Sequence, residues 1–255
     1  MIISHKHRFI FIHCRKSAGS SVVVSLSRFL GEGDLQLSSI PDGAALKIYP
    51  PKRVLNEALL SFPVKEAVKI ILRRKKFWTA VSTTIKRKYS KKLGKFPQHS
   101  DALTIKNAFP FEWENYFKFC VVRNPWDKTV SDYFWRTRKI ENPPSFEQYV
   151  HALADNNPLN GIVPQNHYNW NMYAIDGRIA VDYTIKFEDL ERGLSEALKH
   201  TSVEWDGWMP HAKSMSSITN SEKKRDYRKL YNDTTSRIIS ELYRDEIKHF
   251  GYSFD

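Results

Sequence analysis

Short apolar runs along this chain are each followed by a turn and then by a segment with helical spacing. The apolar runs cover residues 8–13, 116–122 and 181–187. The helical segments that follow them cover residues 22–30, 126–137 and about 190–200. A short apolar run that stops at a turn is typical of a buried strand. Strands that alternate with helices predict an α/β fold, with a parallel sheet flanked by helices.

The residues at the predicted helix starts agree with this pattern. Asn124 is suited to cap the second helix, and Pro125 is suited to its first turn because it needs no backbone N–H there. Asp189 is placed to cap the third helix. We expect Trp126 and Tyr133 to be packing residues rather than ligands.

The composition predicts one globular domain over residues 1–255 with a sizeable core. Of the residues, 41% are hydrophobic, and no stretch is dominated by Gly, Ser or Pro, so a disordered or collagen-like chain is excluded. Residues 1–11 mix basic side chains with short apolar runs, which fits neither a signal peptide nor a membrane anchor. We therefore expect a cytoplasmic protein. Cys14 and Cys120 lie in separate apolar runs, so we expect buried thiols and no metal site.

The positive charge is concentrated in one segment. The chain carries 40 basic and 28 acidic residues, which gives a net charge of +12. Residues 65–95 contain twelve Lys or Arg and a single acid, Glu66, so this segment alone carries 12 − 1 = +11. Val68, Ile71, Leu72 and Phe77 fall at helical intervals, which predicts a basic helical insert over about residues 50–95. A solvated helical face is the alternative interpretation.

The turn after the first apolar run has the composition of an anion-binding loop. Backbone N–H groups at the start of a helix converge on one point, and the helix dipole adds positive charge there. Lys16 can add a point charge, Ser17, Ser20 and Ser21 can donate hydroxyl hydrogen bonds, and Gly19 allows close approach of the backbone. The loop is not a nucleoside-triphosphate loop, because the Gly-Lys-Ser/Thr ending is absent.

A second anion-binding position is predicted where the second apolar run ends. Arg123 stands at the end of this strand, and ligands bind at such ends in open parallel sheets. Ser131 lies eight residues further on, in the following helix, so both side chains are candidates to bind a second anion.

Four segments in this order resemble the sulfotransferase family, specifically the chondroitin and dermatan type of carbohydrate sulfotransferases and their soluble bacterial homologues. The segments are residues 1–30, 97–135, 164–190 and 205–255. The most specific parts are FIFIHCRKSAGSS (residues 9–21), FKFCVVRNPWD (117–127) with Ser131 and Tyr133, MPH (209–211), DYRKLY (226–231) and FGYSF (250–254).

The resemblance implies a P-loop, nucleotide-kinase-like fold and an enzyme that uses 3′-phosphoadenosine 5′-phosphosulfate (PAPS) as donor. Such an enzyme moves a sulfuryl group to a hydroxyl acceptor by in-line displacement and releases adenosine 3′,5′-bisphosphate (PAP), with no metal. Carried over by position, Lys16 would stabilise charge on the departing phosphate. The 5′ end of the donor would be bound by Arg15, Lys16, Ser17, Ala18, Gly19, Ser20 and Ser21. Arg123 and Ser131 would bind the 3′-phosphate.

For the general base, the resemblance favours His99 among nine histidines. Imidazole suits this task because its proton affinity lies near working pH. A capping or surface role is the alternative for His99. We expect His13 to be a packed or orienting residue and His211 to support the C-terminal loop.

The loop departs from the family pattern, because Arg15 stands where the family has Pro, and Ser17 and Ser20 stand where it has Thr. The acceptor is expected to be a carbohydrate or glycoconjugate, or another small alcohol, and residues 164–168 resemble a segment that contacts it. The charge of the insert fits an anionic or lipid-linked acceptor, or peripheral contact with a membrane.

Two other classes of protein fit part of the sequence. A nucleic-acid-binding protein would explain the basic insert with its aromatic residues Phe77, Trp78 and Tyr89, but it leaves Lys16 and Arg123 unexplained, so a nucleic-acid partner is disfavoured. A P-loop-like kinase is disfavoured because the chain has no clear metal-holding acid after a strand.

Overall fold

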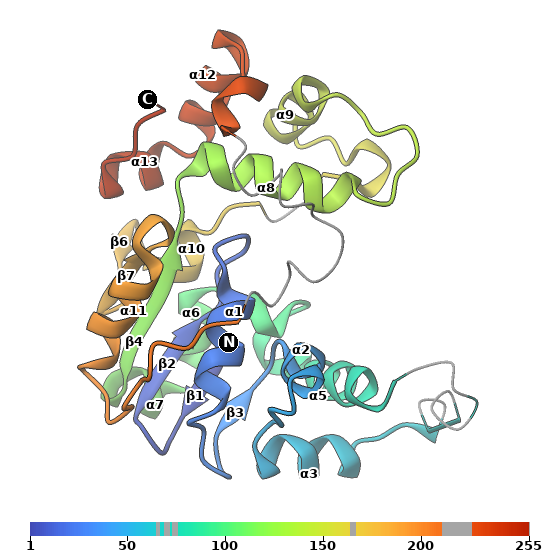
Figure 1. The fold of residues 1–255 in the computed structure, drawn as a ribbon, viewed down its shortest axis with the longest axis vertical. Coiled ribbons are helices and arrows are strands. Elements are labelled where there is room, and N and C mark those ends of the chain that lie inside the picture. Colours follow the sequence, from blue (N-terminus) through green and yellow to red (C-terminus); the bar gives the residue numbers. More distant parts are fainter. Residues whose placement is uncertain (65–66, 69–71, 73–75, 164–166, 211–225, 255) are drawn as a thin grey trace. The chain divides into compact units, whose positions relative to one another are not determined.

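The chain divides into two compact units in the computed structural model, which describes residues 1–64, 67–68, 72, 76–163, 167–210 and 226–254 (Figure 1). Unit 1 comprises Met1–Cys14, Ala18–Val121 and Asn171–Ser216, and unit 2 comprises Arg15–Ser17, Val122–Trp170 and Ser217–Asp255. The chain passes between the units several times, so neither is a continuous segment. One domain over residues 1–255 stays a prediction.

Unit 1 contains a five-stranded sheet in the order β3-β1-β2-β4-β7. These strands are Ile2–Ser4 (β1), Phe9–Ile12 (β2), Leu35–Gln36 (β3), Phe117–Val122 (β4) and Tyr183–Lys186 (β7). Strand β2 is parallel to β4, whereas β1 is antiparallel to both β2 and β3. Strands β2, β3 and β4 therefore run in one direction and β1 opposes them, so the α/β fold with a mostly parallel sheet is confirmed. Strands β5 (Ala174–Ile175) and β6 (Arg178–Ile179) form a separate antiparallel pair.

The antiparallel β1–β2 hairpin is the part of the sheet that differs from the predicted parallel arrangement. Its turn is held by Asp34, whose Oδ1 accepts hydrogen bonds from the backbone N–H groups of His5 and Lys6 at 2.7 and 3.1 Å. Asp34 Oδ2 accepts from the Ser4 hydroxyl at 2.7 Å. A carboxylate that satisfies the N–H groups of a turn lets the chain reverse direction within a few residues.

Helices flank this sheet and share its core. The helices of this part are α1 (Gly19–Ser27), α2 (Ile40–Ala45), α3 (Lys52–Leu60), α5 (Phe77–Leu93), η1 (Pro97–His99), α6 (Ala102–Ala108), α7 (Pro110–Asn115), α10 (Trp170–Tyr173), η3 (Phe187–Asp189) and α11 (Leu190–Leu198). Phe11 and Phe119 on the strands form one buried cluster with Leu26 of α1 and Leu194 of α11. The predicted order of strand, turn and helix is observed at all three places: α1 follows β2, α8 (Pro125–Thr137) follows β4, and α11 follows β7.

Two sequence predictions for unit 1 are refined by the structure. Asp189 is the N-cap residue of α11, but its carboxylate pairs with Arg192 instead of capping the backbone. In the basic segment, α5 buries a stripe that includes Val81 and Ile85, whereas Val68 and Leu72 are exposed. Ile71 and much of the segment between α3 and α5 lie outside the described residues.

Unit 2 consists of helices around its own core. They are α8 (Pro125–Thr137), α9 (Phe146–Ala154), η2 (Leu159–Gly161), η4 (Tyr227–Leu230), α12 (Asp233–Leu242) and α13 (Arg244–Phe250). Trp126 and Tyr133 are buried in this core, as predicted. Asn124 caps α8 by accepting from the backbone N–H of Trp126 at 3.0 Å, which confirms the predicted cap.

Both cysteines, Cys14 and Cys120, are buried thiols, as predicted. Within the described ranges, no helix combines the length and the apolar character needed to cross a bilayer.

Candidate functional site

The loop after β2 contains left-handed backbone at residues other than glycine. The φ angles of Lys16 and Ala18 are 59° and 52°. Such angles are uncommon outside glycine and persist where the surroundings stabilise them. In unit 2, Asn169 stabilises the backbone at the start of this loop. Its Oδ1 accepts a hydrogen bond from the Arg15 N–H at 3.0 Å, and its Nδ2 donates one to the Arg15 carbonyl at 2.8 Å. Asn169 is 2% exposed.

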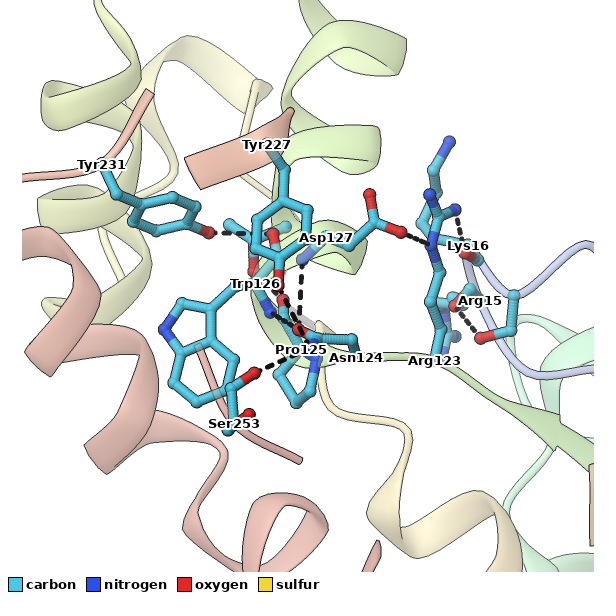
Figure 2. A network of polar contacts seen from close by, with 12 residues as sticks. Arg15, Lys16, Arg123, Asn124, Pro125, Trp126, Asp127, Tyr227, Tyr231 and Ser253 are labelled. Carbon is cyan, nitrogen blue, oxygen red and sulfur yellow. Dashed lines mark hydrogen bonds and ion pairs between the residues drawn. The ribbon is translucent and has the colours of Figure 1, made fainter. Parts of the chain in front are cut away.

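Arg123 connects the end of β4 to this loop (Figure 2). Its Nη1 donates to the Lys16 carbonyl at 3.0 Å, and its Nε donates to Asp127 Oδ2 at 2.8 Å. A guanidinium has five N–H donors in a planar fork, and these two bonds use two of them. The carboxylate therefore orients the guanidinium, and the guanidinium holds the loop backbone.

The Lys16 side chain lies over an aromatic ring of unit 2. Its Nζ is 4.9 Å from the centroid of the Trp135 ring, within the range of a cation–π interaction. Such an interaction favours the charged ammonium and limits its freedom. Trp135 lies on α8, the same helix that carries Asp127.

Ser131, the second residue of the predicted second anion site, lies on α8. Asp127 and Ser131 are four residues apart, so they share one face of the helix. Asp127 is the carboxylate that pairs with the Arg123 guanidinium. This arrangement is compatible with the predicted shared anion, whose binding remains a prediction.

The start of α8 is fixed by the C-terminal part of unit 2 (Figure 2). Asn124 Nδ2 donates to the Ser253 carbonyl at 3.0 Å, and the Tyr231 hydroxyl donates to the Trp126 carbonyl at 2.9 Å. The Tyr227 hydroxyl donates to the Phe254 carbonyl at 3.3 Å. The motifs at residues 226–231 and 250–254 thus support the helix that carries Asp127 and Ser131.

A small cavity that is partly open to solvent lies in unit 2 beside the loop. Its lining comprises Arg15, Lys16, Lys128, Thr129, Asp132, Arg136, Tyr149, Leu153, His167 and Tyr243. Four of these side chains are basic and one is acidic. Two of the four basic side chains, Lys128 and Arg136, form ion pairs with Glu246 and Asp132, so the positive charge of the lining is partly balanced. Arg15 and Lys16 of the loop place further positive charge beside the cavity, which suits an anionic ligand.

Buried ionic contacts set the shape of this cavity. Lys128 Nζ lies 2.8 Å from Glu246 Oε2, with both side chains 4% exposed, and 4.0 Å from the centroid of the Tyr243 ring. The Tyr149 hydroxyl donates to Asp132 Oδ2 at 2.7 Å. Burial, together with the Asp132 charge, raises the pKa of Tyr149 far above its ordinary value, so this phenol stays a hydrogen-bond donor.

In unit 1, the candidate base His99 lies beside His13. His99 Nδ1 is 2.7 Å from the His13 carbonyl oxygen, and the two imidazole rings have centroids 4.6 Å apart in an edge-to-face arrangement. His13 Nδ1 in turn is 2.9 Å from the Ser38 hydroxyl. A carbonyl can only accept, so His99 Nδ1 carries the proton of this hydrogen bond.

Glycine is required at position 19 for a packing reason, which differs from the expected close approach of a ligand. A Cβ atom at this position would lie 2.1 Å from Cδ2 of His13, so only glycine leaves room for the imidazole ring. Ser20 and Ser21 follow in the first turn of α1, and Ala18 is its N-cap residue. The expected orienting role of His13 agrees with this packing.

The structure brings together some of the predicted site residues within each unit. Arg15, Lys16 and Arg123 meet in unit 2, where Ser17 also donates to the Arg15 carbonyl at 3.2 Å. Ala18, Gly19, Ser20, Ser21 and His99 belong to unit 1. Residues 164–166 of the expected acceptor segment and His211 lie outside the described residues.

Two residues of the site were not predicted from the sequence. The role of Asp127 could have been predicted from the sequence, since an acid four residues after an arginine at a helix start can form an ion pair with it. The role of Asn169 could not have been predicted, because it is 154 residues away in the sequence from the loop residue that it contacts. In the described part of the chain, no three His, Cys, Asp or Glu side chains gather as a metal-binding group.

Comparison with known proteins places these features in one family. No curated protein and no solved structure matches the chain. The model of the sulfotransferase family, in contrast, matches residues 1–253. This match includes the loop of Lys16, the strand end at Arg123 and the segments around His99 and the C-terminus. The chain therefore belongs to the sulfotransferase family, whose members transfer a sulfuryl group.

Proposed function

We propose that this protein transfers a sulfuryl group from PAPS to a hydroxyl group of a carbohydrate or glycoconjugate, with His99 as the general base. The observation that carries the donor assignment is the hydrogen bond between Arg123 and the Lys16 carbonyl, 107 residues apart in the sequence. It links the two positions that the family resemblance assigns to the two anionic ends of one donor.

The residues of unit 2 fit such a donor. PAPS supplies an activated sulfuryl group and has negative charge at its 3′-phosphate and its 5′-phosphosulfate. Arg123, oriented by Asp127, is suited to a phosphate because its donors form a planar fork. Lys16 is suited to stabilise the charge that develops on a leaving phosphate. ATP lacks a 3′-phosphate, so the same groups favour the bisphosphate nucleotide over ATP.

The hydrogen bond of His99 supports its role as the base. When Nδ1 donates to the His13 carbonyl, the neutral imidazole carries its lone pair on Nε2. Nε2 is then the atom that would take the proton from an acceptor hydroxyl as the new O–S bond forms. The fixed tautomer lowers the reorganisation needed for this step.

The cavity in unit 2 supports an acceptor that is polar and carries negative charge. Arg15 and Lys16 place positive charge in its lining, and Tyr149 and Tyr243 add aromatic surface. Sugars with carboxylate, phosphate or sulfate substituents combine hydroxyl groups with this charge. We therefore propose an anionic carbohydrate as the acceptor class.

Calorimetric titration with PAP, AMP and ATP tests the donor assignment without knowledge of the acceptor. PAP and AMP differ by the 3′-phosphate alone, so the ratio of their dissociation constants measures how strongly this phosphate is recognised. We expect PAP to bind about 10- to 100-fold more tightly than AMP, which is the range for hydrogen bonds to charged groups. In Arg123→Ala this ratio should fall toward one.

The matched control is Arg28→Ala, which also removes an arginine that is paired with a carboxylate, Asp206, at 2.7 Å. It should leave the PAP-to-AMP ratio unchanged. Equal binding of ATP and PAP by the native protein, or an unchanged ratio in Arg123→Ala, would contradict the donor assignment.

A further inference from the structure

Exposed apolar side chains are concentrated in one stretch of unit 1. Of the 13 large apolar side chains that are exposed in the described part of the chain, eight lie between Leu46 and Phe77. They are Leu46, Tyr49, Leu59, Leu60, Val64, Val68, Leu72 and Phe77. Leu60 and Val64 are 89% and 81% exposed. Single exposed apolar residues are ordinary on protein surfaces, whereas several on neighbouring segments can together form an interaction surface.

An ordered pair of helices supports this stretch. Helices α3 and α5 lie beyond the β3 edge of the sheet (Figure 1). Arg87 of α5 donates to the Ser61 carbonyl at the end of α3 at 2.9 Å, and Lys88 pairs with Glu57 at 3.0 Å. The C-terminal end of α3, with Leu60, is therefore held against the middle of α5. We call the eight exposed apolar side chains, with Lys76 and Arg87, the α3–α5 surface.

Aromatic rings form one part of this surface. Trp78 lies 5.3 Å from Tyr49 and 5.0 Å from Phe77 between ring centroids. Tyr49 is 57% exposed and Phe77 is 39% exposed. Trp and Tyr have an apolar body with a polar end, and for this reason they favour the boundary between a bilayer and water.

The charge of the same region is strongly positive. Residues 65–95 carry +11, and nine of their twelve basic residues are lysines. Lys76, Arg87 and Lys91 are exposed on the described residues. Negatively charged lipid headgroups attract such a segment, and exposed aliphatic side chains gain by entering the acyl boundary. Nucleic acid offers the same attraction to charge but no comparable environment for Leu60 and Val64.

We propose that the α3–α5 surface docks this protein on an anionic membrane. Aliphatic and aromatic side chains would enter the headgroup boundary, and the lysines and arginines would contact the lipid phosphates and carboxylates. This proposal does not depend on the proposed sulfuryl transfer. The two are tested by different measurements, so the failure of one leaves the other intact.

Flotation with lipid vesicles tests the proposal on the full chain. Vesicles of phosphatidylcholine with 30% phosphatidylglycerol should bind the native protein, and vesicles of phosphatidylcholine alone should bind it much more weakly. The double variant Leu60→Asn with Val64→Asn should lose most of this binding. Lys76→Glu should weaken it by about fivefold or more, since each basic residue near an anionic surface contributes about that factor.

Matched control variants change the same residue types elsewhere. Phe111→Asn replaces a side chain that is 65% exposed on α7, and Lys248→Glu reverses an exposed charge on α13. Both should bind vesicles as the native protein does. Circular dichroism and the midpoint of thermal unfolding show that each variant retains its fold, whether or not the protein binds PAP.

Three results would overturn the proposal. The first is equal binding to neutral and anionic vesicles, and the second is full binding by the Leu60 and Val64 double variant. The third is the absence of binding to anionic vesicles, which would assign this surface to a different partner. That partner would be a nucleic acid if duplex DNA binds and Lys76→Glu weakens it, or a second copy if sedimentation shows self-association that the double variant lacks.

Discussion

Positive charge is used in two different ways in this protein. Around the loop after β2, the Lys16 ammonium lies over Trp135, and the Arg123 guanidinium is paired with Asp127 and bonded to the loop backbone. On the α3–α5 surface, basic side chains such as Lys76 are exposed beside apolar ones. Groups held in one geometry can recognise one ligand, whereas exposed groups attract any anionic surface. A charge count alone does not separate these roles.

The largest expected effect is on the transfer rate and comes from replacing His99 of unit 1, whose Nδ1 is hydrogen-bonded to the His13 carbonyl. His99→Ala removes the proposed base, so the rate of sulfuryl transfer to the best acceptor found in a screen of sugars should fall about 10²- to 10⁴-fold. PAP binding should change little, and the acidic limb of the pH–rate profile should disappear. His151→Ala, which removes an exposed histidine on α9, is the control. A variant that retains the native profile would rule out His99 as the base.

The buried ion pair beside the cavity should give the largest effect on stability. Glu246→Gln leaves the Lys128 ammonium buried without a carboxylate, which should lower the free energy of unfolding by about 3–5 kcal/mol in urea titrations. Glu196→Gln breaks the exposed pair with Lys199, which should cost at most about 1 kcal/mol. If both variants lost the same free energy of unfolding, the buried ion pair would contribute no more to stability than the exposed one.

Lys16 should affect rate more than binding. Lys16→Ala removes a charge that is proposed to act on the leaving phosphate, so the transfer rate should fall about 10²- to 10³-fold. The affinity for PAPS, measured without acceptor, should fall by a much smaller factor, because the bridging oxygen of the intact donor carries less charge than it does in the transition state. Rate and binding measurements on one preparation separate the two effects. Equal losses in rate and affinity would reduce Lys16 to a binding residue.

Asn169 should contribute through the backbone that it holds. Asn169→Ala removes both hydrogen bonds to Arg15, which should lower the free energy of unfolding of the protein by about 1–3 kcal/mol. Asn115→Ala is the matched control, since its exposed amide donates to the Phe111 carbonyl of its own helix and not to a distant segment of the described chain. If the two variants lose the same stability, the loop does not depend on Asn169.

The smallest expected effect is on the free energy of unfolding and depends on pH. It concerns Glu57 of α3, which pairs with Lys88 of α5 beneath the α3–α5 surface. Burial by itself would raise the pKa of Glu57, but hydrogen bonds from Arg53, Lys88 and Tyr89 outweigh it and lower the pKa of this carboxyl below its ordinary value. A lowered pKa in the folded state stabilises the protein above the unfolded pKa, and this stability is lost as the pH falls through the folded value.

Glu57→Gln should therefore lower the free energy of unfolding by about 1 kcal/mol at neutral pH. The difference from the native protein should disappear once the pH is below the lowered pKa of Glu57. Denaturant titrations across the acidic range measure it. A difference that does not change with pH would show that the carboxylate charge plays no part in holding α3 against α5.

The local pattern of the sequence was sufficient for the elements that position the site. The apolar runs before Cys14 and Arg123 predicted strands β2 and β4, because alternation of buried runs with turns is a property of adjacent residues. Asn124 was recognisable as a cap for the same reason. Ordered motifs around Lys16 and Arg123 indicated the family, and the family match over residues 1–253 confirmed it.

The local pattern of apolar and polar residues did not predict contacts between residues that are distant in the sequence. The sequence contains no sign that Asn169 holds Arg15, or that His13 fills the space beside Gly19. It also could not indicate that Val68 and Leu72 are exposed, since helical spacing shows which residues share a face and not what covers that face.

By itself, the sequence determined the three strand-and-helix pairs within residues 8–30, 116–137 and 181–200, and it indicated the family. It also pointed to the positions of the candidate site, whose binding of anions stays a prediction. The tertiary structure decided how those positions are held: Arg123 by Asp127, the loop by Asn169, and the His99 tautomer by the His13 carbonyl. It also decided which apolar residues stay on the surface. The physical reason is that periodicity and capping act within a few residues, whereas hydrogen-bond partners and burial depend on segments that only folding brings together.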